Sequence, residues 1–186
     1  GKGSVDAVYD AGIHDAIMQR RGLTNVSNLV DIKKCFERVN HQRVVDRSAA
    51  VDFPLRILAV CLAMYRSARC IVVEQACAGM VVTNNGIGAG CSMATYVLRA
   101  TLALDLLNFV CEILVTSSRF VYRFSVYVDD LMCQVAARDP RIAGFRAASV
   151  TIQLIKLFND IIRLPLAPDK FQLTASDPVA ADTAML

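Results

Sequence analysis

Apolar residues recur every three or four positions in much of the chain, a spacing that places them on one face of an α-helix. This pattern predicts amphipathic helices over four stretches: residues 5–20, 42–50, 54–65 and 141–163. Their ends agree with the local residues, because Gly22 follows the first stretch and Pro54 suits the first turn of the third. Residues 93–111 are apolar on nearly every face and predict a buried central helix.

Shorter runs rich in valine, isoleucine and aromatic residues predict β-strands. These runs cover residues 25–30, 69–75, 80–83, both sides of Asp129-Asp130 within 120–136, and 171–173. The first run leads directly into Asp31. Strands that alternate irregularly with helices are typical of an α+β fold, in which an antiparallel sheet is backed by helices.

Composition narrows the class of protein. The 186 residues are 55% hydrophobic and 20% charged, which excludes a disordered chain and fits one domain with a substantial core. The net charge of +3 permits a nucleic-acid partner without requiring one. Charged residues such as Arg99 and Asp105 interrupt the longest apolar region, so we expect no membrane span and no membrane partner.

The seven cysteines form no Cys-x-x-Cys pair and lie mostly within apolar runs. This distribution favours buried thiols in a reducing compartment over zinc ligands or disulfides. We therefore expect an intracellular protein, with nucleus and cytoplasm left open. His14 and His41 have no Cys or carboxylate partners at metal-ligand spacing, so surface or hydrogen-bonded histidines are the default interpretation.

Asp129 and Asp130 lie between two strand-forming runs, where they would form the tip of a hairpin. Adjacent carboxylates raise one another's pKa, so keeping both ionised favours a bound divalent cation. Mg²⁺ is the simplest candidate, because it prefers oxygen ligands. Taken alone, an Asp-Asp turn in water explains the pair more simply.

Four blocks, taken in order, resemble the palm of reverse transcriptases, particularly those of non-LTR retrotransposons and group II introns. The blocks are Val30 to His41 with Asp31, Phe36 and Val39-Asn40-His41, Gly86 to Ser92, Tyr127-Val128-Asp129-Asp130, and Leu164 to Lys170. The resemblance implies a polymerase palm whose antiparallel sheet carries the Tyr-x-Asp-Asp hairpin. It assigns residues 1–174 to the palm with a small part of the fingers, and leaves 175–186 as a tail.

The resemblance implies an RNA-directed DNA polymerase of a retroelement protein, with two-metal nucleotidyl transfer. Its partners would be an RNA template, a DNA primer, deoxynucleoside triphosphates, and the fingers and thumb of a longer parent protein. Mg²⁺, with Mn²⁺ as an alternative, would bind the carboxylates of Asp31, Asp129 and Asp130 and the Ile32 carbonyl. Lys170 would act near the pyrophosphate. The competing interpretations are a helix cap for Asp31 and a solvated loop lysine for Lys170.

Substrate contacts follow from the same resemblance. Phe36 would lie under the incoming sugar and exclude a 2′-hydroxyl, which favours DNA synthesis, although a core phenylalanine is the competing interpretation. Tyr127 would contact the primer end or the template, or else pack in its strand. The family usually has glutamine where this chain has Ala89, and that glutamine helps to place the nucleotide and the template base. Without it, Gly90 and the backbone would make these contacts.

Two alternatives to an active reverse transcriptase remain open. One is a reverse-transcriptase-like remnant that only binds nucleic acid, and the other is an RNA-directed RNA polymerase, which Phe36 disfavours. The short fingers and the missing thumb predict a fragment, whose activity in isolation is open. Several basic residues are candidates for phosphate contacts or for a solvated face: Arg20, Arg21, Lys33, Lys34, Arg38 and Arg43.

Overall fold

The structure is a computed structural model that describes residues 4–70, 72–74, 76–116, 119–128 and 130–185. The chain forms two compact units. Unit 1 contains Gly1–Lys33 and Asn108–Leu186, and unit 2 contains Lys34–Leu107. Unit 2 is therefore an insertion into unit 1, whereas composition had predicted one domain, and each unit is described by itself below.

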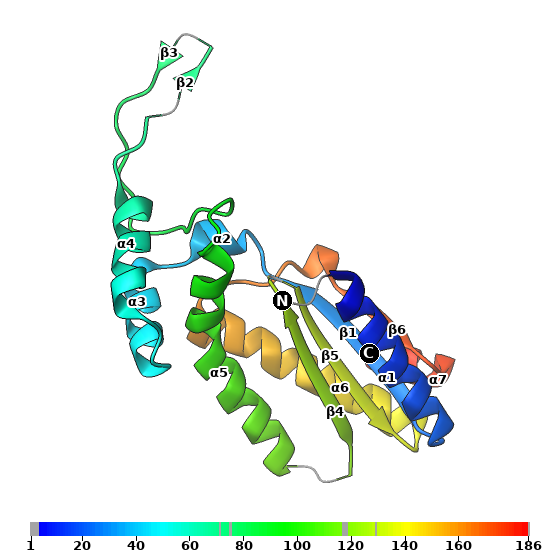
Figure 1. The fold of residues 1–186 in the computed structure, drawn as a ribbon. Helices are drawn as coiled ribbons and strands as arrows, with labels where there is room; N and C mark the ends of the chain where they lie inside the picture. Colours follow the sequence, from blue (N-terminus) through cyan, green and yellow to red (C-terminus); the bar gives the residue numbers. More distant parts are fainter. Residues whose placement is uncertain (1–3, 71, 75, 117–118, 129, 186) are drawn as a thin grey trace. The chain divides into compact units, whose positions relative to one another are not determined.

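Unit 1 is built on a four-stranded antiparallel sheet with the order β4-β5-β1-β6 (Figure 1). The strands are β1 (Thr24–Asp31), β4 (Val121–Tyr127), β5 (Asp130–Ala137) and β6 (Gln172–Ala175). β1 lies in the middle and pairs along its whole length with β5 and along part of its length with β6. The sheet and its helices confirm the predicted α+β fold.

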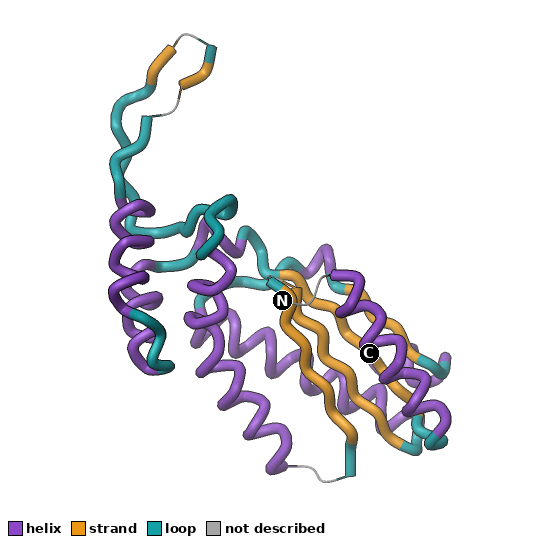
Figure 2. Tube along the Cα trace, in the orientation of Figure 1, coloured by secondary structure: helices purple, strands orange, loops and turns teal. Residues whose placement is uncertain are grey.

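Alternation of side chains along β1 assigns the two faces of the sheet. Val26, Asn28 and Val30 are buried on the face that packs against α6 (Pro140–Lys156). Ser27 and Leu29 are only half-buried on the opposite face, along which α1 (Ser4–Arg20) runs (Figures 1 and 2). One face is therefore a core, and the other is partly open to solvent.

Helix α6 begins at a strong cap and ends in an irregular turn. The Asp139 carboxylate accepts hydrogen bonds from the backbone N–H groups of Arg141 and Ile142, at 2.8 and 3.3 Å. After Lys156 the chain continues as a π-helical turn over Leu157–Ile162. Arg163 then adopts the left-handed conformation with φ 59°, which stops the helix before Leu164.

Residues 175–186, which the sequence assigned to a tail, instead form part of unit 1. Helix α7 (Pro178–Met185) packs against α6. The packing is close because Gly144 has no side chain: a Cβ there would lie 2.5 Å from the Ala180 carbonyl oxygen. The sequence did not predict α7, because eight residues are too few for a clear helical period.

Unit 2 contains three helices before a long hairpin, namely α2 (Cys35–Arg38), α3 (His41–Ala50) and α4 (Leu55–Arg66). Asn40 caps α3 by accepting hydrogen bonds from the N–H groups of Gln42 and Arg43, at 2.9 and 3.1 Å. Strands β2 (Val72–Val73) and β3 (Ala76–Cys77) are shorter than predicted, and the chain turns before Ala76 rather than after it. The hairpin extends beyond the end of α4 (Figure 2).

Helix α5 (Ala94–Thr116) begins in unit 2 and is less buried than its composition predicted. Tyr96 and Leu107 are exposed, at 56% and 60%. Its buried side includes a carboxylate: Asp105 accepts from Arg43 at 2.6 Å and from Arg47 at 2.7 Å. Arg43, a candidate for phosphate contacts from the sequence, therefore has an internal partner that joins α3 to α5.

The cysteines divide into buried and exposed groups. Cys35, Cys61 and Cys133 are buried free thiols, as predicted, and burial raises the pKa of Cys133 to about 12. The prediction was wrong for Cys70 and Cys77, which are exposed and paired as a disulfide across the hairpin with their Cα atoms 6.7 Å apart. The two arms of the hairpin bring these thiols together, which their spacing of seven residues did not reveal.

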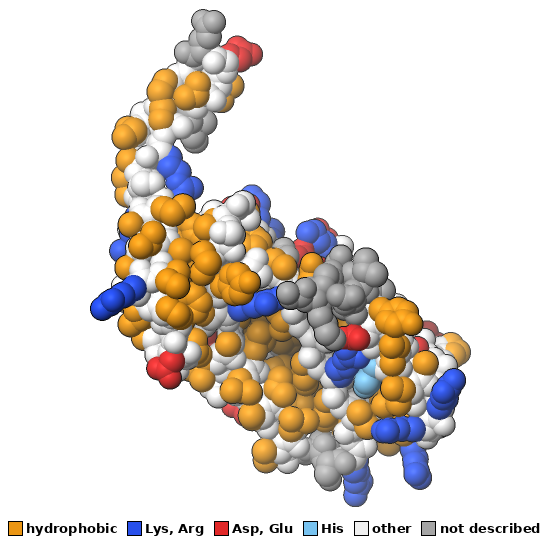
Figure 3. Space-filling model, in the orientation of Figure 1, with side chains coloured by type: hydrophobic (Ala, Val, Ile, Leu, Met, Phe, Trp, Pro, Cys, Tyr) orange, Lys and Arg blue, Asp and Glu red, His pale blue; other side chains and the backbone are white. Residues whose placement is uncertain are grey.

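Exposed apolar side chains gather on the hairpin and along α4 in the view of Figure 3. They include Val72, Val73, Met80, Val82 and Val60, each more than 60% exposed. Within the described residues, no helix has the length and apolar character needed to span a bilayer.

Candidate functional site

The register of β1 and β5 brings two of the predicted carboxylates together. Asp31 and Asp130 are direct partners at the end of the antiparallel ladder. Residues opposite one another project on the same face, with Cβ atoms about 5 Å apart. Asp31 is 8% exposed, whereas Asp130 is open to solvent. Two like charges so placed destabilise the pair unless a cation lies beside them.

The hairpin turn differs from the predicted Asp-Asp turn. Tyr127 pairs with Asp130, so Asp130 belongs to β5, and the turn between the strands begins at Val128. Val128 has φ 58°, an uncommon conformation for a β-branched residue that costs about 1–3 kcal/mol. Pairing with β1 extends the ladder to Asp130 and explains the difference. The predicted ligand Asp129 lies outside the described residues.

Lys170 reaches the first of these carboxylates, that of Asp31. Its ammonium lies 2.5 Å from Asp31 Oδ2. The backbone holds the lysine segment against the end of β1, because Ala167 N–H donates to the Asp31 carbonyl and Lys33 N–H donates to the Pro165 carbonyl, each at 2.9 Å. The Lys170 side chain is 64% exposed, so solvent screens and weakens the ion pair.

The carboxylate pair fits a divalent cation by its chemistry. Asp31 and Asp130 supply the hard oxygen donors that Mg²⁺ prefers, and the ammonium on Asp31 occupies a position that a cation suits. Ile32, whose carbonyl was a predicted ligand, is buried and bridges to Leu166. The described residues hold no group of three or more His, Cys, Asp or Glu side chains arranged for a metal.

The predicted substrate residues of unit 2 also come together. Phe36 is half-buried in α2, and its carbonyl accepts a 2.7 Å hydrogen bond from Ile87 N–H. Gly86 has φ +90°, and a Cβ there would lie 3.2 Å from the Glu37 carbonyl, so only glycine fits without strain. Ala89 and Gly90 follow as exposed residues. The glycine loop therefore lies along the helix that carries Phe36.

Two residues that sequence reasoning did not place in the site lie against this loop. His41 is fully buried and bonded to the Gly86 carbonyl. Cys91 is half-buried, and the Tyr65 hydroxyl and the backbone N–H of Met93 lower the pKa of its thiol. The signal for His41 was its place directly after Val39-Asn40 in the first block.

Comparisons with known proteins test the fold. No family model matches the sequence, and no curated protein matches it. Two solved structures of Candida tropicalis telomerase do match the model. The apo form, truncated from its C-terminal domain, has a TM-score of 0.65 at 11% identity, over 95% of this chain and 36% of that one. The complex with the TWJ fragment of telomeric RNA has a TM-score of 0.67 at 11% identity, over 95% and 30%.

Candida albicans telomerase in complex with the TWJ fragment of telomeric RNA gives a TM-score of 0.63 at 14% identity, over 95% and 32%. The chain has a reverse-transcriptase-like fold. It spans about a third of the length of these telomerase structures. The similarity supports this fold alone, and it does not assign the chain to the non-LTR or group II intron type.

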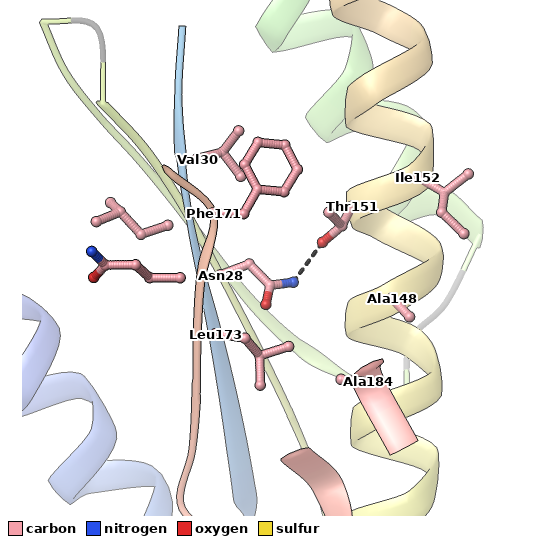
Figure 4. Close-up of a pocket in the computed structure, with 10 residues that line it drawn as sticks. Asn28, Val30, Ala148, Thr151, Ile152, Phe171, Leu173 and Ala184 are labelled. Atoms are coloured by element: carbon pink, nitrogen blue, oxygen red, sulfur yellow. Dashed lines mark hydrogen bonds between the residues drawn. The ribbon is translucent and has the colours of Figure 1, made fainter. Parts of the chain in front are cut away.

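A cavity of about 240 Å³ lies beside the reverse-transcriptase-like sheet, between β1, β6 and α6 (Figure 4). Its lining is mostly apolar, with Val30, Phe171 and Leu173 on the sheet side. Asn28 Nδ2 donates to Thr151 Oγ1 at 2.5 Å across it. Val30 and Asn28 alternate with Asp31 along β1, so the cavity and the carboxylates lie on opposite faces of the sheet.

Proposed function

We propose that the chain is the palm of an RNA-directed DNA polymerase that belongs to a retroelement protein. The observation that supports this most strongly is the meeting of Asp31, Asp130 and Lys170 at one end of the sheet. The β1–β5 register and the bonds of the lysine segment are made by the backbone, so neither requires these side chains. A common role in binding metal and phosphate best explains why the three lie together.

Asp31, Asp129 and Asp130, with the Ile32 carbonyl, would hold Mg²⁺, and Mn²⁺ would substitute for it. The bound ions would activate the primer 3′-hydroxyl and stabilise the charge that develops on the phosphate. The ladder fixes the carboxylate of Asp31 opposite that of Asp130. Lys170 would leave Asp31 as the site fills and would donate a proton or a hydrogen bond to the departing pyrophosphate.

The substrate contacts would come from Phe36 under the sugar, Tyr127 at the primer end, and the backbone at Ala89 and Gly90. The partners would be an RNA template, a DNA primer and deoxynucleoside triphosphates, with the fingers and thumb supplied by a longer protein. RNA in two of the telomerase structures supports a nucleic-acid partner in general. The four sequence blocks support the retroelement origin.

Primer extension on an RNA template tests the proposal. Asp130→Asn removes one charge without touching the backbone ladder, and we expect extension to fall by about a thousandfold or more with the fold intact. Asp182 is an exposed residue of α7, so Asp182→Asn is the matched control. This variant should extend primers at the wild-type rate. Equal rates for Asp130→Asn and wild type, both measured in the full-length parent protein, would remove the polymerase function.

Sugar discrimination and metal binding give separate readouts. Phe36→Val should accept ribonucleotides more readily, and an unchanged preference would contradict the role of Phe36. Lys170→Met removes a cation that competes at Asp31, so Mn²⁺ should bind several-fold more tightly. Weaker Mn²⁺ binding by Lys170→Met would contradict this competition.

A nucleic-acid binding remnant is the second candidate, and Ala89 is the observation that favours it. Such a protein would bind RNA–DNA hybrids but would not extend primers, and Asp130→Asn would not change its affinity for Mn²⁺.

A further inference from the structure

The glycine loop, residues 84–90, is held along the end of the first sequence block, residues 36–41, within unit 2. Three backbone hydrogen bonds join them: Ile87 N–H to the Phe36 carbonyl at 2.7 Å, Gly86 N–H to the Val39 carbonyl at 2.8 Å, and His41 N–H to the Asn84 carbonyl at 3.0 Å. Asn40 Nδ2 also donates to Asn85 Oδ1 at 3.0 Å. These bonds couple the position of the glycine loop to that of the helix that carries Phe36.

The side chain of His41 completes this contact and ties it to α4. Its Nε2 lies 2.7 Å from the Gly86 carbonyl oxygen, and its Nδ1 lies 3.3 Å from Arg66 Nε. A carbonyl only accepts and an arginine N–H only donates. Nε2 must therefore carry the proton, and Nδ1 must be the acceptor, so the two neighbours define a single neutral tautomer.

Because His41 is buried, both of its ring nitrogens need hydrogen-bond partners within the protein. His41 is 0% exposed, and the ring of Tyr65 lies beside it with centroids 6.4 Å apart. A buried imidazole that lost either partner would leave a polar group unsatisfied. If the proton were on Nδ1, two hydrogen-bond donors, this N–H and that of Arg66, would face each other without an acceptor. The pair His41–Arg66 thus specifies where the Gly86 carbonyl lies.

We propose that His41, locked in its Nε2–H tautomer by Arg66, is a positioning residue that sets the glycine loop against Phe36 and thereby sets nucleotide affinity and sugar preference. The second half of this statement rests on the proposed polymerase function. His41 would contact no substrate itself. It would act through the Gly86 carbonyl and the backbone of Ile87.

Two substitutions separate the ring nitrogens. The amide of His41→Gln reaches about as far as Nε2 and keeps a donor for the Gly86 carbonyl, whereas His41→Asn reaches only to Nδ1 and keeps an acceptor for Arg66. His41→Phe removes both bonds while keeping a ring. Arg66→Met removes the tautomer lock, and Arg56→Met, an exposed arginine on the same helix, is its matched control.

The first readout is amide hydrogen exchange at Gly86 and Ile87 by NMR, with the ¹⁵N shifts of the His41 ring reporting the tautomer. It needs no enzymatic activity. We expect His41→Phe and His41→Asn to lower protection at both amides by about tenfold or more. His41→Gln should restore most of it, and Arg66→Met should lower protection where Arg56→Met does not. Protected β1 and β5 amides in each variant will show that unit 1 remains folded.

The second readout is primer extension. We expect His41→Phe to raise the KM for deoxynucleotides and to narrow the preference over ribonucleotides, with rescue by His41→Gln. Wild-type protection at Gly86 and Ile87 in His41→Phe overturns the proposal whatever the activity. Lost protection with an unchanged KM and unchanged sugar preference also overturns it. A wild-type full-length parent protein that extends no primer refutes the proposed function instead, and the exchange data still decide whether His41 positions the loop.

Discussion

The two units hold their candidate site residues by different means. In unit 1 the backbone ladder places Asp31 opposite Asp130, and backbone bonds place the Lys170 segment beside them. In unit 2 the side chains of Asn40 and His41 supplement the backbone bonds to the glycine loop. The carboxylates can therefore be changed chemically without moving their neighbours. The glycine loop has no such independence, because side chains are among the groups that position it.

The first prediction concerns the ion pair that joins α3 to α5 in unit 2. Asp105→Asn leaves Arg43 and Arg47 without their buried carboxylate and should cost about 3 kcal/mol. Hydrogen exchange should show the loss in unit 2 amides and little change in β1 and β5. Asp46→Asn, an exposed residue of α3, is the control. Equal losses of protection in both units would contradict the difference between them, because the units would then unfold as one.

The second prediction concerns the close packing of α6 and α7 in unit 1. Gly144→Ala places a Cβ 2.5 Å from the Ala180 carbonyl oxygen and should cost about 2 kcal/mol in the free energy of unfolding. Gly12→Ala in α1 meets nothing within 4 Å and should stabilise by about 0.5–1 kcal/mol. Urea titrations measure both changes. A stabilising Gly144→Ala would show that α7 does not dock there.

The third prediction concerns the cap of α3. Asn40→Ala removes the acceptor for Gln42 and Arg43 and the bond to Asn85, and should cost about 1 kcal/mol. Asn40→Ser keeps a capping oxygen but loses the reach to Asn85. If side chains position the glycine loop, Asn40→Ser should retain thermal stability and still lose exchange protection at Gly86. Retained protection in Asn40→Ala would mean that the backbone bonds suffice, as they do in unit 1.

The smallest effect is a difference in thiol reactivity. The pKa of Cys91 is lowered and that of Cys133 is raised to about 12, so Cys91 carries more thiolate at pH 7 and should alkylate first with iodoacetamide. Raising the pH should accelerate Cys91 only up to its lowered pKa, while Cys133 should react only when the sheet opens. Mass spectrometry of timed samples measures both rates. Faster labelling of Cys133 would contradict the buried sheet of unit 1.

Local pattern predicted most elements, because helical spacing and strand-forming runs depend on neighbouring residues. α1, β1, α3, α4 and the β4–β5 hairpin all lie close to their predicted ranges. α7 was missed because its eight residues are too few for a clear helical period, and its docking against α6 depends on the absent side chain of Gly144. The exposure of Tyr96 on α5 was missed because apolar composition alone does not show which faces find partners.

The site shows the same division. The sequence by itself determined which residues are candidates for the site, since the order of the four blocks selects Asp31, Asp130, Lys170 and Phe36. Only the tertiary structure decided that Asp130 belongs to a strand and faces Asp31, and that His41 is buried between Gly86 and Arg66. The physical reason is that strand register and buried hydrogen bonds are set by partners distant in the chain, which no local pattern contains.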